Sequence, residues 1–185
     1  KVGGLEKAGE YNLVQRLFSI QNTLHFSLVN SLWSIYTDAA TVGDNQWLRR
    51  TLRLSTLLTL FLFFTGGLIL VVIGKWVVLI WSGKLIEDSL LFMLMAIWSF
   101  LFGIINNFTV FLNSINILKG QCFFLAVAAV VNIPLALSMG SKIGIAGVCL
   151  AGIIAMLPLA IYDVIESIRI LKKISVYCTP KTGHS

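Results

Sequence analysis

The sequence predicts an all-α protein, a polytopic bundle of transmembrane helices, and three observations lead to this fold class. The chain of 185 residues is 57% hydrophobic and 12% charged, whereas a soluble domain carries roughly 25% charged residues. Its mean hydropathy is +0.90, so its apolar surface would be poorly solvated in water. The apolar residues also gather in stretches of about 20, enough for a helix to cross a hydrocarbon core about 30 Å thick.

We expect five spans, at residues 11–36, 54–72, 90–113, 122–139 and 143–162. Basic residues cluster between the first two spans, between the third and fourth, and after the fifth, which by the positive-inside rule makes those segments cytoplasmic. Residues 174–185 then form a cytoplasmic tail, and the odd number of spans leaves the N-terminus outside. Because the chain begins at Lys1 without a methionine or signal region, we expect a fragment whose earlier spans are missing.

The first span is unusually polar. When it is wound into a helix, its polar residues fall on one stripe, because they follow steps of three and four. A lone charge at the centre of a span costs at least about 2.5 kcal/mol, so polar groups normally face a bundle interior or a wet cavity. We therefore expect the stripe to face inward. Its members are Asn12, Gln15, Arg16, Ser19, Asn22, Thr23, Ser27, Asn30 and Ser34.

The third span repeats this pattern more weakly. Two continuous polar faces exceed what helix association needs, since an interhelical hydrogen bond contributes about 0.6 kcal/mol, and together they favour a hydrated passage. The alternative is that these residues only pack against other helices. The polar side of the third span carries Ser99, Gly103, Asn106, Val110 and Asn113, with Asn107 and Ser114 beside it.

The last two spans have the chemistry of a scaffold. Pro134 removes a backbone donor from the fourth span and favours a kink there. The fifth span carries Gly147, Ala151 and Ala155 at four-residue spacing, which allows two helices to approach closely.

Several stretches resemble a known family. YNLVQRLFSI, SLWSIYTDAATVGDNQWLRRTLRLS, FLNSINILKGQ, VVNIPLALSM and KIGIAGVCLAG are similar to the C-terminal half of bacterial polysaccharide-export flippases. These belong to the multidrug, oligosaccharidyl-lipid and polysaccharide transporter superfamily. The resemblance runs from Tyr11 to Lys173. The family often has prolines where this chain has Ser31 and Ser34, so a milder bend is expected there.

The resemblance implies that residues 1–173 form most of the C-terminal transmembrane lobe of a two-lobed transporter in the bacterial inner membrane. Its cargo would be an oligosaccharide repeat unit of O-antigen or exopolysaccharide, carried on a polyprenyl diphosphate. The implied partners are this lipid-linked oligosaccharide, membrane lipids, the missing N-terminal lobe, a polysaccharide polymerase and a chain-length regulator. No enzyme activity, cofactor, metal or nucleic acid is implied.

The same resemblance gives the stripe a role in binding. Arg16 is the candidate for the diphosphate, because a guanidinium pairs with phosphate oxygens at two points. The alternative is that Arg16 only snorkels to the outer headgroups. The other expected cavity residues are Asn12, Gln15, Ser19, Asn22, Thr23, Asn106 and Asn113.

Charged residues near the span ends have simpler interpretations. Arg49, Arg50 and Arg53 follow Asp44, a candidate N-cap, and we expect them on a short surface helix, either contacting anionic lipids or serving as a topology signal. Asp163 and Glu166 are expected to pair with Arg169 and nearby lysines. His25 lies off the centre of the stripe, which favours a packed, interhelical histidine.

Two other functions remain open. A multidrug or cation antiporter of the same superfamily would commonly use an intramembrane carboxylate, and none falls in the middle of an expected span. An intramembrane enzyme acting on polyprenyl phosphates needs clustered acids, bases or metal ligands. The sequence offers only His25 and His184 as histidines, and no two of its three cysteines have metal-ligand spacing.

Overall fold

The computed structural model describes residues 4–177, and these form six helices with no strand among them. The last helix continues to Tyr177, so the expected tail begins helically, and residues 178–185, with His184, lie outside the described residues. The all-α fold class is confirmed. The helices are α1 (Leu5–Asn30), α2 (Leu32–Val42), α3 (Asn45–Ser82), α4 (Ser89–Ser114), α5 (Lys119–Ile143) and α6 (Ile145–Tyr177).

Four of these helices are long and apolar enough to cross a membrane: α3, α4, α5 and α6. The chain is thus a multi-pass membrane protein. The expected first span is not a fifth apolar helix. It is divided at Ser31 into α1 and α2, and α1, although about 39 Å long, carries four charged side chains, those of Glu6, Lys7, Glu10 and Arg16.

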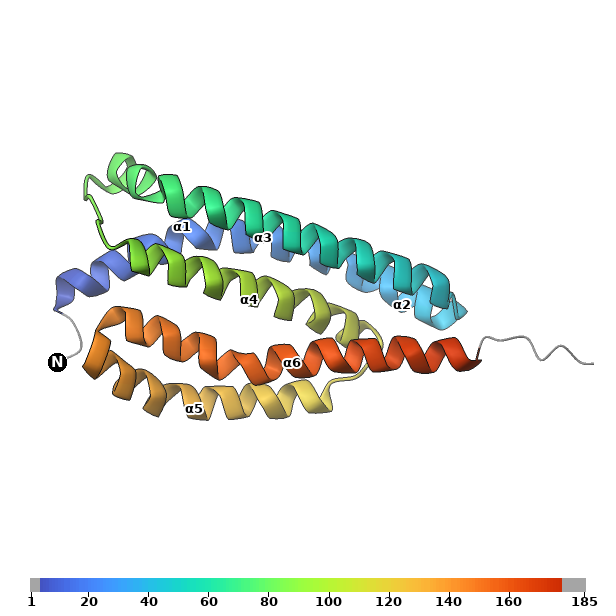
Figure 1. Cartoon of the computed structure of the whole chain (residues 1–185). Helices are drawn as coiled ribbons and strands as arrows, with labels where there is room; N and C mark the ends of the chain where they lie inside the picture. Colours follow the sequence, from blue (N-terminus) through green and yellow to red (C-terminus); the bar gives the residue numbers. More distant parts are fainter. Residues whose placement is uncertain (1–3, 178–185) are drawn as a thin grey trace, which may run out of the picture.

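The helices pack around α4, as Figure 1 shows. Helices α1 and α3 lie on one side of α4, α6 lies on the other, and α5 packs against α6. Helices α4 and α6 run in the same direction, with α5 antiparallel between them in the chain. We call the end of the bundle that holds the α2–α3 and α4–α5 junctions the basic end. Its cationic residues are Arg49, Arg50, Arg53, Lys119, Arg169, Lys172 and Lys173.

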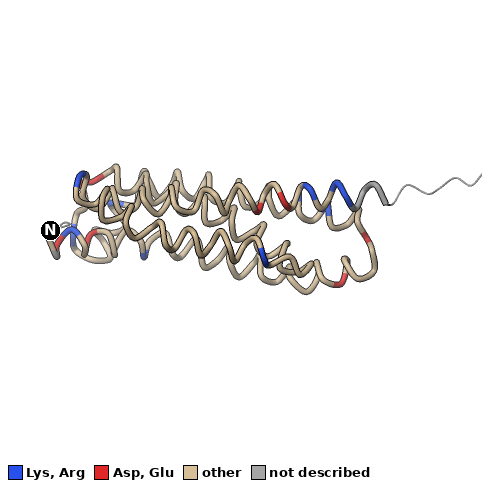
Figure 2. The backbone as a smooth tube through the Cα atoms, turned by 90° about the horizontal axis from the view of Figure 1, so that it is seen from below, with Lys and Arg blue, Asp and Glu red and all other residues tan. Residues whose placement is uncertain are grey.

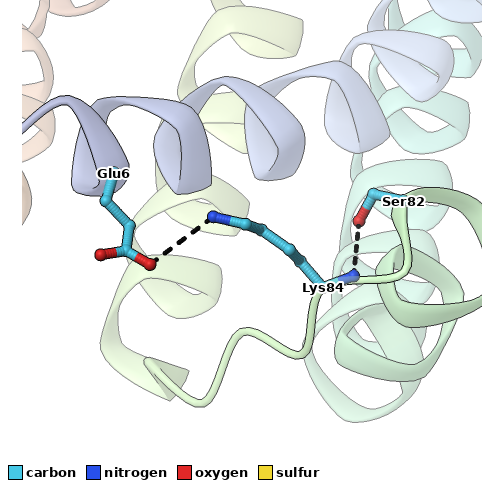
Figure 3. Close-up of polar contacts among 3 residues, drawn as sticks. All are labelled: Glu6, Ser82 and Lys84. Carbon is cyan, nitrogen blue, oxygen red and sulfur yellow. Dashed lines mark hydrogen bonds and ion pairs between the residues drawn. The ribbon is translucent and has the colours of Figure 1, made fainter.

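Charge is concentrated at the two ends of the bundle, and the middle is almost free of it (Figure 2). The end opposite the basic end joins α1 to the α3–α4 connection through an ion pair, in which the Lys84 ammonium lies 3.6 Å from a Glu6 carboxylate oxygen (Figure 3). Both side chains are more than half exposed, so the pair contributes little to stability.

Local sequence signals explain the helix boundaries. Gly43 takes a positive φ of 77° and ends α2, and Asp44 then caps α3 by accepting a hydrogen bond of 3.0 Å from the Trp47 backbone amide. The N-cap expected at Asp44 is confirmed. The arginines that follow are part of α3 itself, so the expected short surface helix is wrong. Pro134 and Pro158 lie inside α5 and α6, and both helices continue past them.

Small residues bring α5 and α6 together as expected. A Cβ atom added to Gly147 would lie 2.3 Å from the carbonyl oxygen of Met139 on α5, so only glycine fits. Ala151 and Ala155 follow on the same side of α6, and both are buried. The close packing predicted for this span is confirmed.

Candidate functional site

Helix α1 presents three different faces. Val14, Leu17, Phe18, His25 and Val29 are buried against the other helices. Ile20, Leu24 and Leu28 form an exposed apolar face. The polar stripe occupies the remainder, with Asn12, Gln15, Arg16, Ser19, Thr23 and Ser27 exposed and with Asn22 and Asn30 half-buried.

The stripe therefore points away from the bundle that residues 4–177 form. The inward face expected from the sequence is wrong for this bundle, because helical periodicity identifies a face but not the side on which neighbouring helices lie. The Arg16 guanidinium makes no hydrogen bond or ion pair with any described residue, and only its backbone oxygen is engaged, by the Ser19 hydroxyl at 2.7 Å. Its donors are free to meet a ligand.

An apolar groove lies beside the stripe, between α1 and α3. It has a volume of about 480 Å³. Ile20, which lines the groove, is one helical turn from Arg16, so the two side chains are neighbours on α1. A cationic group and an apolar groove thus lie next to one another. The remaining lining residues are Leu17, Gln21, Leu24, Leu58, Phe61, Leu62, Thr65, Gly66, Ile69 and Leu70.

Two of the expected site residues connect helices or lie in the interior. Asn22 accepts a hydrogen bond from the buried Ser99 hydroxyl of α4. Asn106 is buried, and its Nδ2 atom has no hydrogen-bond partner among the described residues. Asn107, beside it, is fully buried and donates to the Thr56 hydroxyl of α3 at 3.0 Å. For Ser99 and Asn107, packing against other helices is the correct interpretation.

His25 is the interhelical histidine that the sequence indicates. Only 1% of it is exposed, and its Nε2 atom lies 2.9 Å from the Thr59 hydroxyl of α3. The ring also packs edge-on against Phe63, with 4.9 Å between ring centres. These contacts fix α1 on α3.

Asp163 does not make the ion pair that the sequence predicted. Its side chain is fully buried between α4 and α6, and it accepts a hydrogen bond of 2.7 Å from the Thr109 hydroxyl instead of pairing with Arg169. Glu166 alone makes the expected pair, with its Oε2 atom 3.0 Å from the Arg169 guanidinium. The bundle therefore holds a carboxyl group in its interior, contrary to expectation. The four-residue spacing of Ala151, Ala155, Leu159, Asp163 and Ser167, all of them buried, was the signal in the sequence.

A second cationic feature lies at the basic end. Arg49, Arg53 and Lys172 line a pocket of about 330 Å³ between α3 and α6, whose apolar walls include Phe108 and Ile168. Arg49 also donates a hydrogen bond to the Leu171 carbonyl. Arg50 is exposed and is not part of this lining. The arrangement suits an anionic headgroup with its acyl chains on the apolar wall.

Comparisons of this chain with protein-family models, curated proteins and solved structures found no match.

Proposed function

We propose that this chain forms one lobe of a transporter that moves polyprenyl-diphosphate-linked oligosaccharides across the bacterial inner membrane. The observation that carries the proposal is on α1, where an exposed polar stripe with the unpaired Arg16 adjoins a large apolar groove. A lipid-linked oligosaccharide has the same division, because its sugars and diphosphate are polar and its tail is apolar.

Each part of the α1 surface suits the chemistry of one part of this cargo. Amides and hydroxyls such as those of Asn12, Gln15 and Ser19 hydrogen-bond to sugar hydroxyls. The Arg16 fork pairs with diphosphate oxygens, and the polyprenyl tail stays in the bilayer beside the groove that begins at Ile20.

The exposure of the stripe supports a two-lobed architecture. A polar face of this length is costly against lipid, and a second lobe facing it would enclose a hydrated cavity that alternates its access by rocking. The 185-residue chain on its own should therefore not transport. Export restored in a flippase-deficient strain by this chain alone, without another lobe, would contradict this.

Arg16 provides the sharpest test. In the complete transporter, we expect Arg16→Lys to reduce export at matched protein levels, since lysine keeps the charge but loses two-point pairing. Arg16→Ala should be worse, because losing a charge-assisted hydrogen bond costs about 1.5–3 kcal/mol, or roughly tenfold or more in affinity. Leu28→Ala, on the exposed apolar face of α1, is the matched control and should export normally.

The outcomes separate the two roles open to Arg16. If it only snorkels, Arg16→Lys should export fully, because both side chains snorkel. Full export by both Arg16 variants would remove this residue from the binding site.

The orientation in the membrane is tested separately. We propose that the basic end is cytoplasmic, in line with the positive-inside rule. A single cysteine introduced near Gly43 should resist an impermeant thiol reagent in intact cells, and one near Lys84 should react with it. Labelling near Gly43 but not near Lys84 would show that the basic end lies outside the cell.

The buried Asp163 favours a second candidate, a drug or cation antiporter of the same superfamily, since such transporters commonly couple through an intramembrane carboxylate. Vesicles that contain the complete protein distinguish the two candidates. Efflux of organic cations without any movement of lipid-linked sugar would favour the antiporter.

A further inference from the structure

The most unusual group in the bundle interior is the Asp163 carboxyl. None of its side chain is exposed, and no lysine, arginine or histidine of the described chain lies within ion-pair distance. Its Oδ2 atom accepts from Thr109, but its Oδ1 atom is buried without a hydrogen-bond partner. A buried, unpaired carboxylate is costly, and in proteins such a group is usually neutralised by a proton or by a cation.

Its surroundings contain further unsatisfied oxygens. The hydrogen bond between Thr109 and Asp163 shows which residues of the parallel helices α4 and α6 lie side by side. About three turns earlier, Trp98 on α4 lies next to Gly152 on α6 with the same offset, so the two helices keep this register. One turn beyond the contact, each helix places another polar residue, Asn113 on α4 and Ser167 on α6. The Asn113 Oδ1 and Ser167 Oγ atoms are both buried and lack a hydrogen-bond partner.

This arrangement is complementary to a proton. A proton on Oδ1 would turn an unsatisfied acceptor into a donor, and one helical turn away on α4 and α6 lie two further buried oxygens that lack partners among the described residues. The Thr109 hydroxyl would continue to donate to Oδ2 in either state. No such complementarity exists for the nearby Glu166, which is already paired with Arg169.

We propose that Asp163, together with Thr109, Asn113 and Ser167, forms a membrane-embedded proton-binding site. Uptake of a proton forms an O–H bond on the Asp163 carboxylate and removes its negative charge, and release restores the charge. In a transporter this site would couple a proton to the movement of the lobe. The inference concerns the energy source and not the cargo, so it holds for either function proposed above.

The titratable groups on the surrounding helices leave Asp163 without direct compensation. Helix α4 has none. In the halves of α3, α5 and α6 that lie toward the basic end, the other titratable groups are Arg49, Arg50 and Arg53 on α3, Lys119 and Cys122 on α5, and Tyr162, Glu166, Arg169, Lys172 and Lys173 on α6. None of the cationic groups in this set forms an ion pair with Asp163.

Infrared difference spectroscopy of the complete protein in lipid vesicles tests the site without any cargo. As the pH is changed, we expect a carboxyl C=O band that shifts in D₂O and is lost in Asp163→Asn. Glu166→Gln, which removes the neighbouring carboxyl that is already paired with Arg169, should keep the band and is the matched control. Thr109→Val should move the band to higher frequency, because the carboxyl loses a hydrogen-bond donor.

Two results would overturn the proposal. The first is a spectrum of Asp163→Asn identical to wild type at every pH. The second is loss of the band on addition of Na⁺ at constant pH, which would identify a sodium site. If Asp163→Asn does not fold, as judged from its helical amide band, the frequency shift in Thr109→Val decides, and an unshifted band would reject the site.

Discussion

Helices α1 and α6 both carry polar residues at helical spacing, but they place them on opposite sides. On α1 the polar residues Gln15, Arg16 and Ser19 are exposed, whereas on α6 Asp163 and Ser167 are fully buried. Polar residues thus meet two environments, and serine occurs in both. Gln15, Arg16 and Ser19 are therefore not needed for packing within the described residues, whereas Asp163 and Ser167 are enclosed by the neighbouring helices.

We expect the largest effect from a substitution that disturbs the packing of α6 against α5. Gly147→Ala should destabilise the protein by about 3 kcal/mol, the upper end of overpacking costs, because the new Cβ would meet the Met139 backbone at 2.3 Å. Gly152→Ala, also on α6, should be tolerated, since its nearest neighbour, Trp98, is 3.5 Å away. On α1, Gly9→Ala meets nothing within 4 Å and should be neutral. Thermal unfolding in detergent measures all three, and equal stabilities would refute the tight packing.

A matched pair of serines tests the comparison directly. Ser167→Leu should cost about 1–3 kcal/mol, because the site is fully buried and has no room for the larger side chain. Ser19→Leu should leave stability unchanged, because Ser19 is exposed. Ser167→Ala is the control for volume and should remain folded, since it removes an oxygen that lacks a partner. Chemical unfolding in mixed micelles would measure the loss of stability in each variant. Equal losses for Ser167→Leu and Ser19→Leu would show that the two serines do not differ in packing.

Two glutamines on α1 allow the same comparison of a packed and an exposed polar side chain within one helix. Gln21 donates a hydrogen bond of 3.1 Å to the Leu62 carbonyl of α3, so Gln21→Ala should cost about 1 kcal/mol. Gln15 lies on the exposed stripe, and Gln15→Ala should change transport without changing stability. If Gln15→Ala proved the more destabilising of the two, the stripe would have a structural role.

The sequence was sufficient for the features that depend on local chemistry. It predicted the all-α membrane fold, the cap at Asp44, the packed His25 and the close approach at Gly147, because each follows from residue type and spacing. The division between α1 and α2 at Ser31 falls where the resemblance implied a mild bend, although the residues themselves offer neither glycine nor proline as a signal.

The remaining errors concern tertiary contacts. Hydropathy ended the last span just before Asp163, because a charged residue lowers the local average, and its partner Thr109 is 54 residues away in the sequence. Periodicity grouped the stripe of α1 correctly, but the direction of the stripe depends on how α3 and α4 pack. For the same reason the expected cavity residues divide between an exposed face on α1 and less accessible positions, where Asn22 is hydrogen-bonded to α4 and where Asn106 and the amide oxygen of Asn113 are buried.

The turn between α5 and α6 has a consequence for biosynthesis. Only Gly144, with a φ of 67°, separates Ile143 from Ile145, so the two apolar helices have almost no connecting chain between them. The turn must stay at one surface of the membrane, so α5 and α6 cross the bilayer in opposite directions. During synthesis, the direction that α5 takes therefore determines that of α6.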